Sequence, residues 1–102
     1  MMIVLFRSRL TAAAGADYGA MADEMLERAR TMPGFVSFKH YGAEDGERLS
    51  VIHWESEATV RGWAEDVRHR EAQRLGRERW YSWFAIEVAQ VVRAYDFERP
   101  AS

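Results

Sequence analysis

Residues 35–54, FVSFKHYGAEDGERLSVIHW, decide the fold, because they hold two strand-like segments on either side of a turn. The segments 35–42 and 48–54 are rich in β-branched and aromatic residues, which favour strands. Between them, the run Glu44-Asp45-Gly46-Glu47 contains the Asp-Gly pair that is a strong hairpin signal. The sequence therefore predicts an antiparallel pair of strands over 35–54.

One strand and one helix are predicted before this hairpin. Residues 2–10, MIVLFRSRL, are mostly apolar and β-branched and predict a strand. Residues 17–31 carry apolar side chains at helical spacing, with charged residues on the opposite face. Asp17 is the predicted N-cap of this helix, and Pro33-Gly34 is the predicted stop.

A helix in two pieces and a final strand are predicted after the hairpin. Ser56 is placed to cap the first helical piece, which we expect to break near Asp66. The second piece is predicted from about residue 68 to residue 75, with Gly76 as its end. Residues 85–97, AIEVAQVVRAYDF, predict a long last strand.

The resulting order, β-α-β-β-α-β, predicts an α+β fold of the ferredoxin-like sandwich type with a broken second helix. We expect a single domain over residues 1–102, with its core at about 2–97. Helices can cover only one face of such a sheet, yet the strands are apolar on both sides, as residues 3–6 show. The uncovered face needs a partner, and we expect a second copy of the chain, giving a homodimer.

Composition excludes several classes of protein. Of the 102 residues, 48% are hydrophobic and 13% aromatic, so long disorder is excluded. The 14 basic and 16 acidic residues leave no basic patch for nucleic acid. Without cysteine there is no disulfide, thiolate chemistry or cysteine-bound metal. The apolar start is too short to span a membrane and lacks the features of a signal peptide, so we expect a cytoplasmic protein.

His40 and His53 lie on the two paired strands of the hairpin. A two-residue Asp-Gly turn would place both on one face, whereas a slip of one residue would separate them. Both are most simply polar strand residues, and we predict no metal site.

His69 stands one helical turn before Gln73, beside Ala72 and Gly76. These small residues mark the closely packed side of the helix, so His69 and Gln73 are expected to point inward or into a cleft. An imidazole there titrates near neutrality and could move protons. The alternative is a histidine that only packs against the neighbouring elements.

Aromatic residues are unusually frequent in the second half of the chain. Trp63 is most simply a core residue, and Trp54 is placed to anchor the corner between a strand and a helix. A flat aromatic ligand could be walled by four residues of the run 80–84: Trp80, Tyr81, Trp83 and Phe84. The alternative is that these side chains form core, as aromatic residues usually do.

Several short motifs resemble the antibiotic biosynthesis monooxygenase (ABM) domain family over roughly residues 2–97. They are Met32-Pro33-Gly34-Phe35, Trp54-Glu55-Ser56-Glu57, Gly62-Trp63, and His69-Arg70-x-x-Gln73 with Trp80-Tyr81. The resemblance implies a dimeric α+β barrel made from two ferredoxin-like sheets. Characterised members include cofactor-free monooxygenases that turn anthrone-type phenols into quinones, and haem-degrading monooxygenases.

The resemblance also implies roles for single residues. In the quinone-forming members the tryptophan of the Trp-Glu-Ser-Glu motif lines the pocket, and here it is Trp54. An asparagine four residues earlier is replaced by Ser50, and a tyrosine six residues later by Val60.

In the haem degraders the site consists of an asparagine on the first strand, the Gly-Trp tryptophan and a histidine ten residues later. These positions are Ser8, Trp63 and Gln73 in this chain, so the haem-ligating histidine is missing.

We therefore predict a cofactor-independent monooxygenase that acts with O₂ on a small polycyclic aromatic of the anthrone or phenol type. The predicted catalytic group is His69 as the base with Trp63 and Ser8, and the predicted substrate-binding group is Trp54, Gln73, Tyr81 and Ser50. Two alternatives stay open: a haem-binding or haem-degrading monooxygenase that uses His69, and a small-ligand binding module without catalysis.

Overall fold

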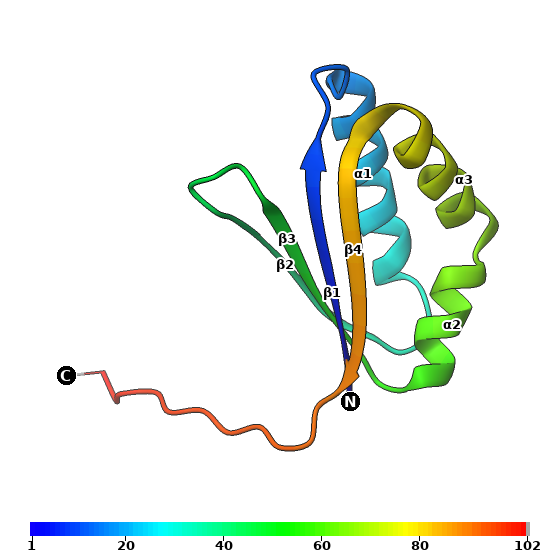
Figure 1. Cartoon of the computed structure of the whole chain (residues 1–102). Helices are drawn as coiled ribbons and strands as arrows, with labels where there is room; N and C mark the ends of the chain where they lie inside the picture. The colour runs from blue at the N-terminus through cyan, green and yellow to red at the C-terminus, as the bar shows by residue number, and fades with distance from the viewer. Residues whose placement is uncertain (102) are drawn as a thin grey trace.

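The computed structural model describes residues 1–101, apart from the side chain of Val67. Its elements are β1 (Met2–Leu10), α1 (Ala16–Arg30), β2 (Phe35–Gly42), β3 (Arg48–Trp54), α2 (Glu57–Glu65), α3 (Val67–Leu75), the π-helical turn η1 (Gly76–Trp80) and β4 (Tyr81–Gln90). This is the predicted βαββαβ order, with the second helix broken as expected (Figure 1). The α+β, ferredoxin-like fold class is thereby confirmed.

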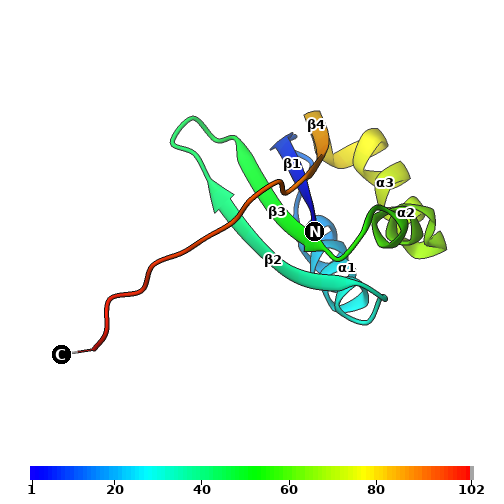
Figure 2. The same cartoon turned by 90° about the horizontal axis from the view of Figure 1, so that it is seen from below.

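The four strands form one antiparallel sheet in the order β2-β3-β1-β4. All three helices lie against one face of this sheet, and the other face has no covering element within the described chain (Figures 1 and 2). Because side chains alternate along a strand, even-numbered residues of β1, β3 and most of β4 face the helices. Odd-numbered residues face the open side.

The hairpin differs in register from a two-residue Asp-Gly turn. Gly42 pairs with Arg48 and His40 with Ser50, which leaves a loop of residues 44–46 closed by a bond from the Ala43 N–H to the Glu47 carbonyl, 2.8 Å long. Gly46 takes a positive φ of 92°. A three-residue loop that ends in a left-handed glycine is a common hairpin geometry, and it shifts the register by one residue.

The helix ends match the sequence in part. Ser56 caps α2 through the Thr59 N–H, as predicted, and the chain breaks at Asp66, which ends α2 and caps α3. The predicted cap of α1 is wrong, because Gly15 holds the N-cap position. Asp17 lies in the first turn instead, where its carboxylate accepts the indole N–H of Trp80 at 3.1 Å.

The end of α3 is as predicted: the helix stops at Leu75 with Gly76 as its C-cap, and the π-helical turn η1 follows directly to Trp80. One prediction near the end of the chain is corrected. The last strand is β4 at 81–90 rather than 85–97. The Val91 N–H still donates to the Met1 carbonyl, but within the described residues the segment 92–101 pairs with no strand. It runs away from the body as an extended tail (Figure 1).

The buried core is small. Among the described residues its buried hydrophobic side chains are those of Trp54, Trp80 and Ala29. Phe38 and Ile86 point toward the helices and are still 36% and 48% exposed, because the helical layer encloses a cavity rather than filling the space above the sheet. No helix within residues 1–101 is long and apolar enough to cross a membrane.

Candidate active site

A cavity of about 430 Å³ lies between the helices and the sheet face that they cover. Six of the seven site residues predicted from sequence line it: Ser50, Trp54, Trp63, His69, Gln73 and Tyr81. Ser8 is the exception. It is buried within β1, between Arg48 on β3 and Phe84 on β4, and is not part of the lining. A direct contact between Ser8 and a ligand, which the sequence predicted, therefore finds no support in its position.

One end of the cavity is built from a stack of aromatic rings. The imidazole of His69 lies parallel to the indole of Trp63, with centroids 4.2 Å apart and 13° between planes. Trp63 in turn stacks on Trp54 at 6.1 Å, and Phe35 meets Trp54 edge-on at 5.6 Å. This stack joins the two helical pieces to β3 and leaves the His69 ring with one face covered.

Two sequence motifs meet at the base of this stack. The N–H of Glu55, beside Trp54, donates to the carbonyl of Gly34 at 2.8 Å. Gly34 has φ of 83°, and a Cβ built on it would overlap the side chain of Thr59. Only glycine fits there, because any side chain would collide with Thr59, which follows the Trp-Glu-Ser-Glu segment.

The protonation of His69 follows from its hydrogen bond. Nδ1 lies 2.9 Å from the carbonyl oxygen of Trp63, and a carbonyl can only accept, so Nδ1 carries the proton. Nε2 is then the basic nitrogen. Burial lowers the pKa of His69 below its usual 6.5, against smaller raising effects from the Trp63 carbonyl and Asp66. His69 is thus a neutral imidazole near pH 7, with a free lone pair in the lining of an apolar cavity.

The other end of the cavity is lined by tyrosine and phenylalanine. The ring of Tyr81 lies 5.4 Å from Phe6 and 5.9 Å from Tyr18, in both cases edge-on. It also packs on Gly76, where a Cβ would overlap the ring. Burial, assisted by Tyr18, raises the pKa of Tyr81 above its usual value of 10, so this phenol stays protonated and can donate a hydrogen bond.

Gln73 lies between these two ends. It is one turn beyond His69 on α3 and lines the cavity. Its amide both donates and accepts, so it can hold a carbonyl or a hydroxyl of a ligand.

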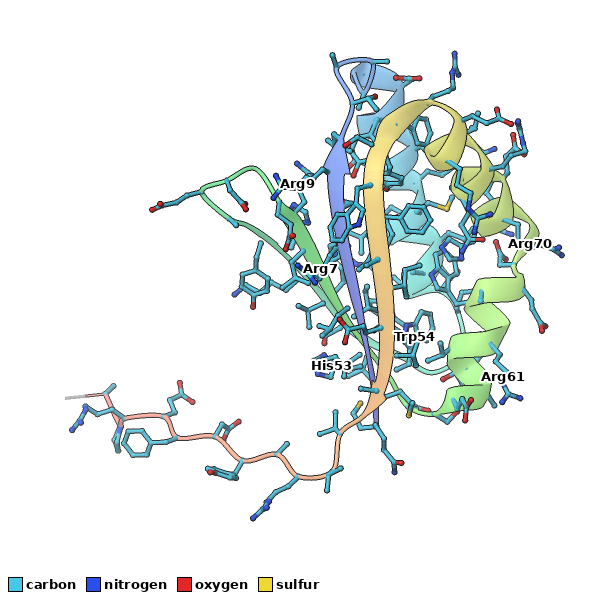
Figure 3. All side chains as sticks on the ribbon, viewed as in Figure 1. Arg7, Arg9, His53, Trp54, Arg61 and Arg70 are labelled. Atoms are coloured by element: carbon cyan, nitrogen blue, oxygen red, sulfur yellow. The ribbon has the colours of Figure 1, made fainter. Side chains whose placement is uncertain are left out.

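The one-residue shift of the hairpin decides the positions of the other two histidines. His40 faces the cavity, where Nδ1 is 3.3 Å from the Ser50 hydroxyl. His53 lies on the open face beside Ser37. In Figure 3, His53 and its neighbour Trp54 point to opposite sides of the sheet. The two histidines therefore share no site. No group of three or more metal-ligating side chains occurs in the described part of the chain.

The aromatic residues of the run 80–84 also lie on both faces of the sheet. Tyr81 and Phe84 line the cavity, and Trp80 is almost fully buried at its edge. Trp83 points to the open face instead, 40% exposed, with the guanidinium of Arg7 over its ring at 5.2 Å. Trp83 is therefore no wall of the cavity.

The sequence analysis missed several lining residues as site residues, among them Tyr18, His40 and Arg48. The positions of His40 and Arg48 follow only from the strand register. Once the loop is known to hold three residues, both share a face of the sheet with Ser50. Taken together, the cavity offers flat apolar walls, the neutral imidazoles of His69 and His40, neutral hydrogen-bonding groups, and the charged side chains of Asp23, Arg48 and Arg77. Such a site can bind an aromatic ring system and remove a proton from it.

Comparisons of the sequence with known proteins identify a family and a relative of this chain. Residues 1–75 match the family described as "Antibiotic biosynthesis monooxygenase". The protein YqjZ of Bacillus subtilis is 32% identical over 81 residues, which is 79% of this chain and 71% of YqjZ.

Solved structures agree with the fold. The protein Rv0793 of Mycobacterium tuberculosis superposes with a TM-score of 0.80 at 18% identity, over 93% of this chain and 98% of that one. SnoaB of Streptomyces nogalater, a cofactor-independent oxygenase, superposes with a TM-score of 0.77 at 12% identity, over 91% and 94% of the two chains.

Proposed function

Because this chain belongs to the antibiotic biosynthesis monooxygenase family, we propose that it is a cofactor-independent monooxygenase. Its substrate is a small polycyclic aromatic of the anthrone or phenol type, which it oxidises with O₂. The observation that carries this proposal is His69: a neutral imidazole with Nδ1 fixed on a carbonyl and Nε2 free, at the aromatic end of an apolar cavity.

The reaction needs little from the protein. Nε2 of His69 takes a proton from the acidic ring carbon, and the carbanion passes one electron to O₂. The two radicals combine to form a C–O bond and, after protonation, a hydroperoxide. Loss of the remaining C–H proton, with cleavage of the O–O bond, gives the ketone and one water. Carbon loses four electrons and O₂ gains four, so no further reductant is required.

The remaining lining residues have supporting roles in this proposal. Trp54, Trp63 and Tyr81 hold the flat ring system, and Gln73 and Ser50 bind its oxygen atoms. Holding the reacting carbon beside the base and excluding water would account for much of the rate enhancement.

Oxygen uptake with a tricyclic anthrone tests the proposal. We expect the wild-type protein to consume one O₂ per anthrone, faster than the anthrone oxidises in buffer alone. His69→Asn retains a side-chain N–H for the Trp63 carbonyl but has no basic nitrogen, so its rate should fall by about 10²–10⁴-fold, the range typical of a lost general base. Arg70→Ala, an exposed neighbour that points away from the cavity (Figure 3), is the matched control and should leave the rate unchanged.

Two other results would replace this function with one of its alternatives. Ligand binding without uptake above the buffer rate, over a set of anthrones, would indicate a binding module. A Soret band on titration with haem, lost in His69→Asn, would indicate a haem protein.

We further propose that the protein works as a homodimer in the cytoplasm, its open sheet face packed against a second copy. The open face carries Leu5, Val51 and Trp83. The tail adds Val92, Tyr95 and Phe97, which are 78–91% exposed in the single chain. The radius of gyration of 15.0 Å also exceeds the roughly 13 Å typical of a compact chain of this length, because the tail stands away from the body.

A further inference from the structure

Arg48 occupies an unusual position in the cavity. It is the first residue of β3, paired with Ser8 on one side and Gly42 on the other, and it lies on the face covered by the helices. Its guanidinium carbon is 5.8 Å from the centroid of the Tyr18 ring. A permanent positive charge therefore stands among aromatic side chains at the end of the cavity opposite the His69 stack.

This guanidinium lacks partners. Nε of Arg48 is the only buried side-chain nitrogen or oxygen without a hydrogen-bond partner among the described residues. Buried polar groups in proteins are nearly always paired, and a charged donor without an acceptor is costly. The guanidinium carbon lies near the Tyr18 ring, but no hydrogen bond or ion pair of the Arg48 side chain occurs among the described residues.

In contrast to Arg48, the two arginines on the open side of β1 are paired with carboxylates. Arg7 forms a bidentate pair with Glu47 at 3.0 Å, and Arg9 pairs with Asp45 at 2.8 Å. Two of the three acidic residues of the hairpin, Asp45 and Glu47, are thus engaged on the open side. No carboxylate within residues 1–101 pairs with Arg48.

No ion pair compensates the charge of Arg48 among the described residues of the cavity. Burial first, and then the positive charge of Arg48, lower the pKa of His40, so this neighbour is neutral near pH 7. Tyr81 also stays neutral. Asp23, an acidic residue of the lining, is exposed and forms no ion pair among the described residues.

We propose that Arg48 binds an anionic oxygen on the ligand, so that the natural ligand is an acidic aromatic that carries a phenolate or a carboxylate. A planar guanidinium with free N–H groups matches either group well, and the surrounding rings would strengthen the bond by excluding water. The neutral side chains of His40 and Ser50 beside it can donate or accept further hydrogen bonds.

The position of Arg48 also orients the ligand. Arg48 and Trp54 stand at opposite ends of β3, about 20 Å apart at the usual rise per strand residue. The anionic group therefore lies far from the carbon that His69 would deprotonate, and the ring system extends along the cavity between them. Because the anionic contact is then the same before and during the reaction, Arg48 should govern binding rather than the chemical step.

Binding of oxidised, unreactive ligands tests this inference without any turnover, and so separately from the proposed function on which the assignment of a substrate rests. Quenching of tryptophan fluorescence would compare an anthraquinone carboxylate, a hydroxyanthraquinone held above its phenol pKa, and unsubstituted anthraquinone. We expect one or both anions to bind at least tenfold more tightly than the neutral quinone, and whichever anion does so identifies the group. Equal binding of all three by the wild-type protein would overturn the proposal.

Three variants test whether the preference for anionic over neutral quinones depends on Arg48. Arg48→Met should lose it, with anion affinity about 10–100-fold lower and neutral quinone binding unchanged. Arg48→Lys keeps the charge and should retain part of the preference, which also serves if the methionine variant folds poorly. Arg77→Met, which removes an exposed arginine of the same lining, should retain all of it. A preference that persists in Arg48→Met, or that disappears in Arg77→Met, would contradict the assignment.

Discussion

The carboxylate of Asp66 accepts the backbone N–H of His69 at 3.1 Å, and the same carboxylate pairs with Arg28 of α1 through bonds of 2.7 and 3.0 Å. Asp66 stands at the break between α2 and α3 and is the N-cap of the helix that carries His69. The hydrogen bond from Arg28 is the main reason that the pKa of Asp66 is lowered. The position of the candidate base thus depends on an anchored charge.

Removing this anchor should affect stability and turnover together. Asp66→Ala loses the cap and the partner of Arg28, and we expect a loss of about 1–2 kcal/mol in the free energy of unfolding. Oxygenation should fall as well, although Asp66 is no lining residue. Asp66→Asn keeps a good cap without the charge and should lose less of both. Urea denaturation and oxygen uptake would measure these effects, and an alanine variant as stable as the asparagine variant would contradict the role as a cap.

The activity of the wild-type protein should depend on pH through His69. As a base, His69 must be neutral, and its pKa lies below 6.5 because of burial. The rate should therefore rise with pH through a single ionisation below 6.5 and stay level between pH 7 and 8. Initial rates of oxygen uptake, corrected for oxidation in buffer at each pH, would show this profile. A midpoint above 7 would exclude His69 as the base.

The stability of the fold should also depend on pH through His69. In the unfolded chain His69 takes up a proton near pH 6.5, whereas in the folded protein it does so only at lower pH. Stability is therefore complete above pH 6.5 and decreases as the pH falls from 6.5 through the folded-state pKa. Asp66 remains charged in this window, because its pKa is lowered from 3.8. Melting curves should show a smaller loss between pH 7 and 5 for His69→Asn than for the wild type; an equal loss would show that other groups are responsible.

Gly34 and Gly19 provide a matched pair of substitutions. Gly34→Ala requires a residue other than glycine at a φ of 83° and forces a methyl group against Thr59, so we expect a loss of about 2–4 kcal/mol. Gly19→Ala lies in α1 with open space around it and should instead stabilise by about 0.5–1 kcal/mol. Chemical denaturation of both variants tests this, and similar effects of the two would disprove the packing at Gly34.

The proposed dimer makes a further prediction. Light scattering at micromolar concentration should give about twice the monomer mass of 11.8 kDa. A variant with both Tyr95→Ser and Phe97→Ser should dissociate at a higher concentration than the wild type, since these side chains are 91% and 78% exposed in the single chain. A double substitution of exposed helix residues, Arg61→Ser with Arg70→Ser, is the control. A wild-type monomer at that concentration would end the dimer proposal.

Local signals were sufficient for much of the fold. The strands 2–10, 35–42 and 48–54 agree with the structure to the residue, because β-branched runs bounded by polar turns depend on neighbours in sequence. The Ser56 cap and the break at Asp66 are equally local. The last strand was predicted too long, because residues 92–97 have a strand-like composition but pair with no neighbouring strand within residues 1–101.

The candidate site was less accessible, because it depends on which face of the sheet each residue occupies. The helical spacing of His69 and Gln73 was enough to place them together in the lining. The sequence by itself therefore determined the order of the elements, the broken helix and the helix face that carries the candidate base. Only the tertiary structure decided that His40 and Arg48 face the cavity, while His53 and Trp83 face away. The physical reason is that one extra residue in the hairpin loop reverses the sides of β2 relative to β3, and that register is settled by strand pairing rather than by composition.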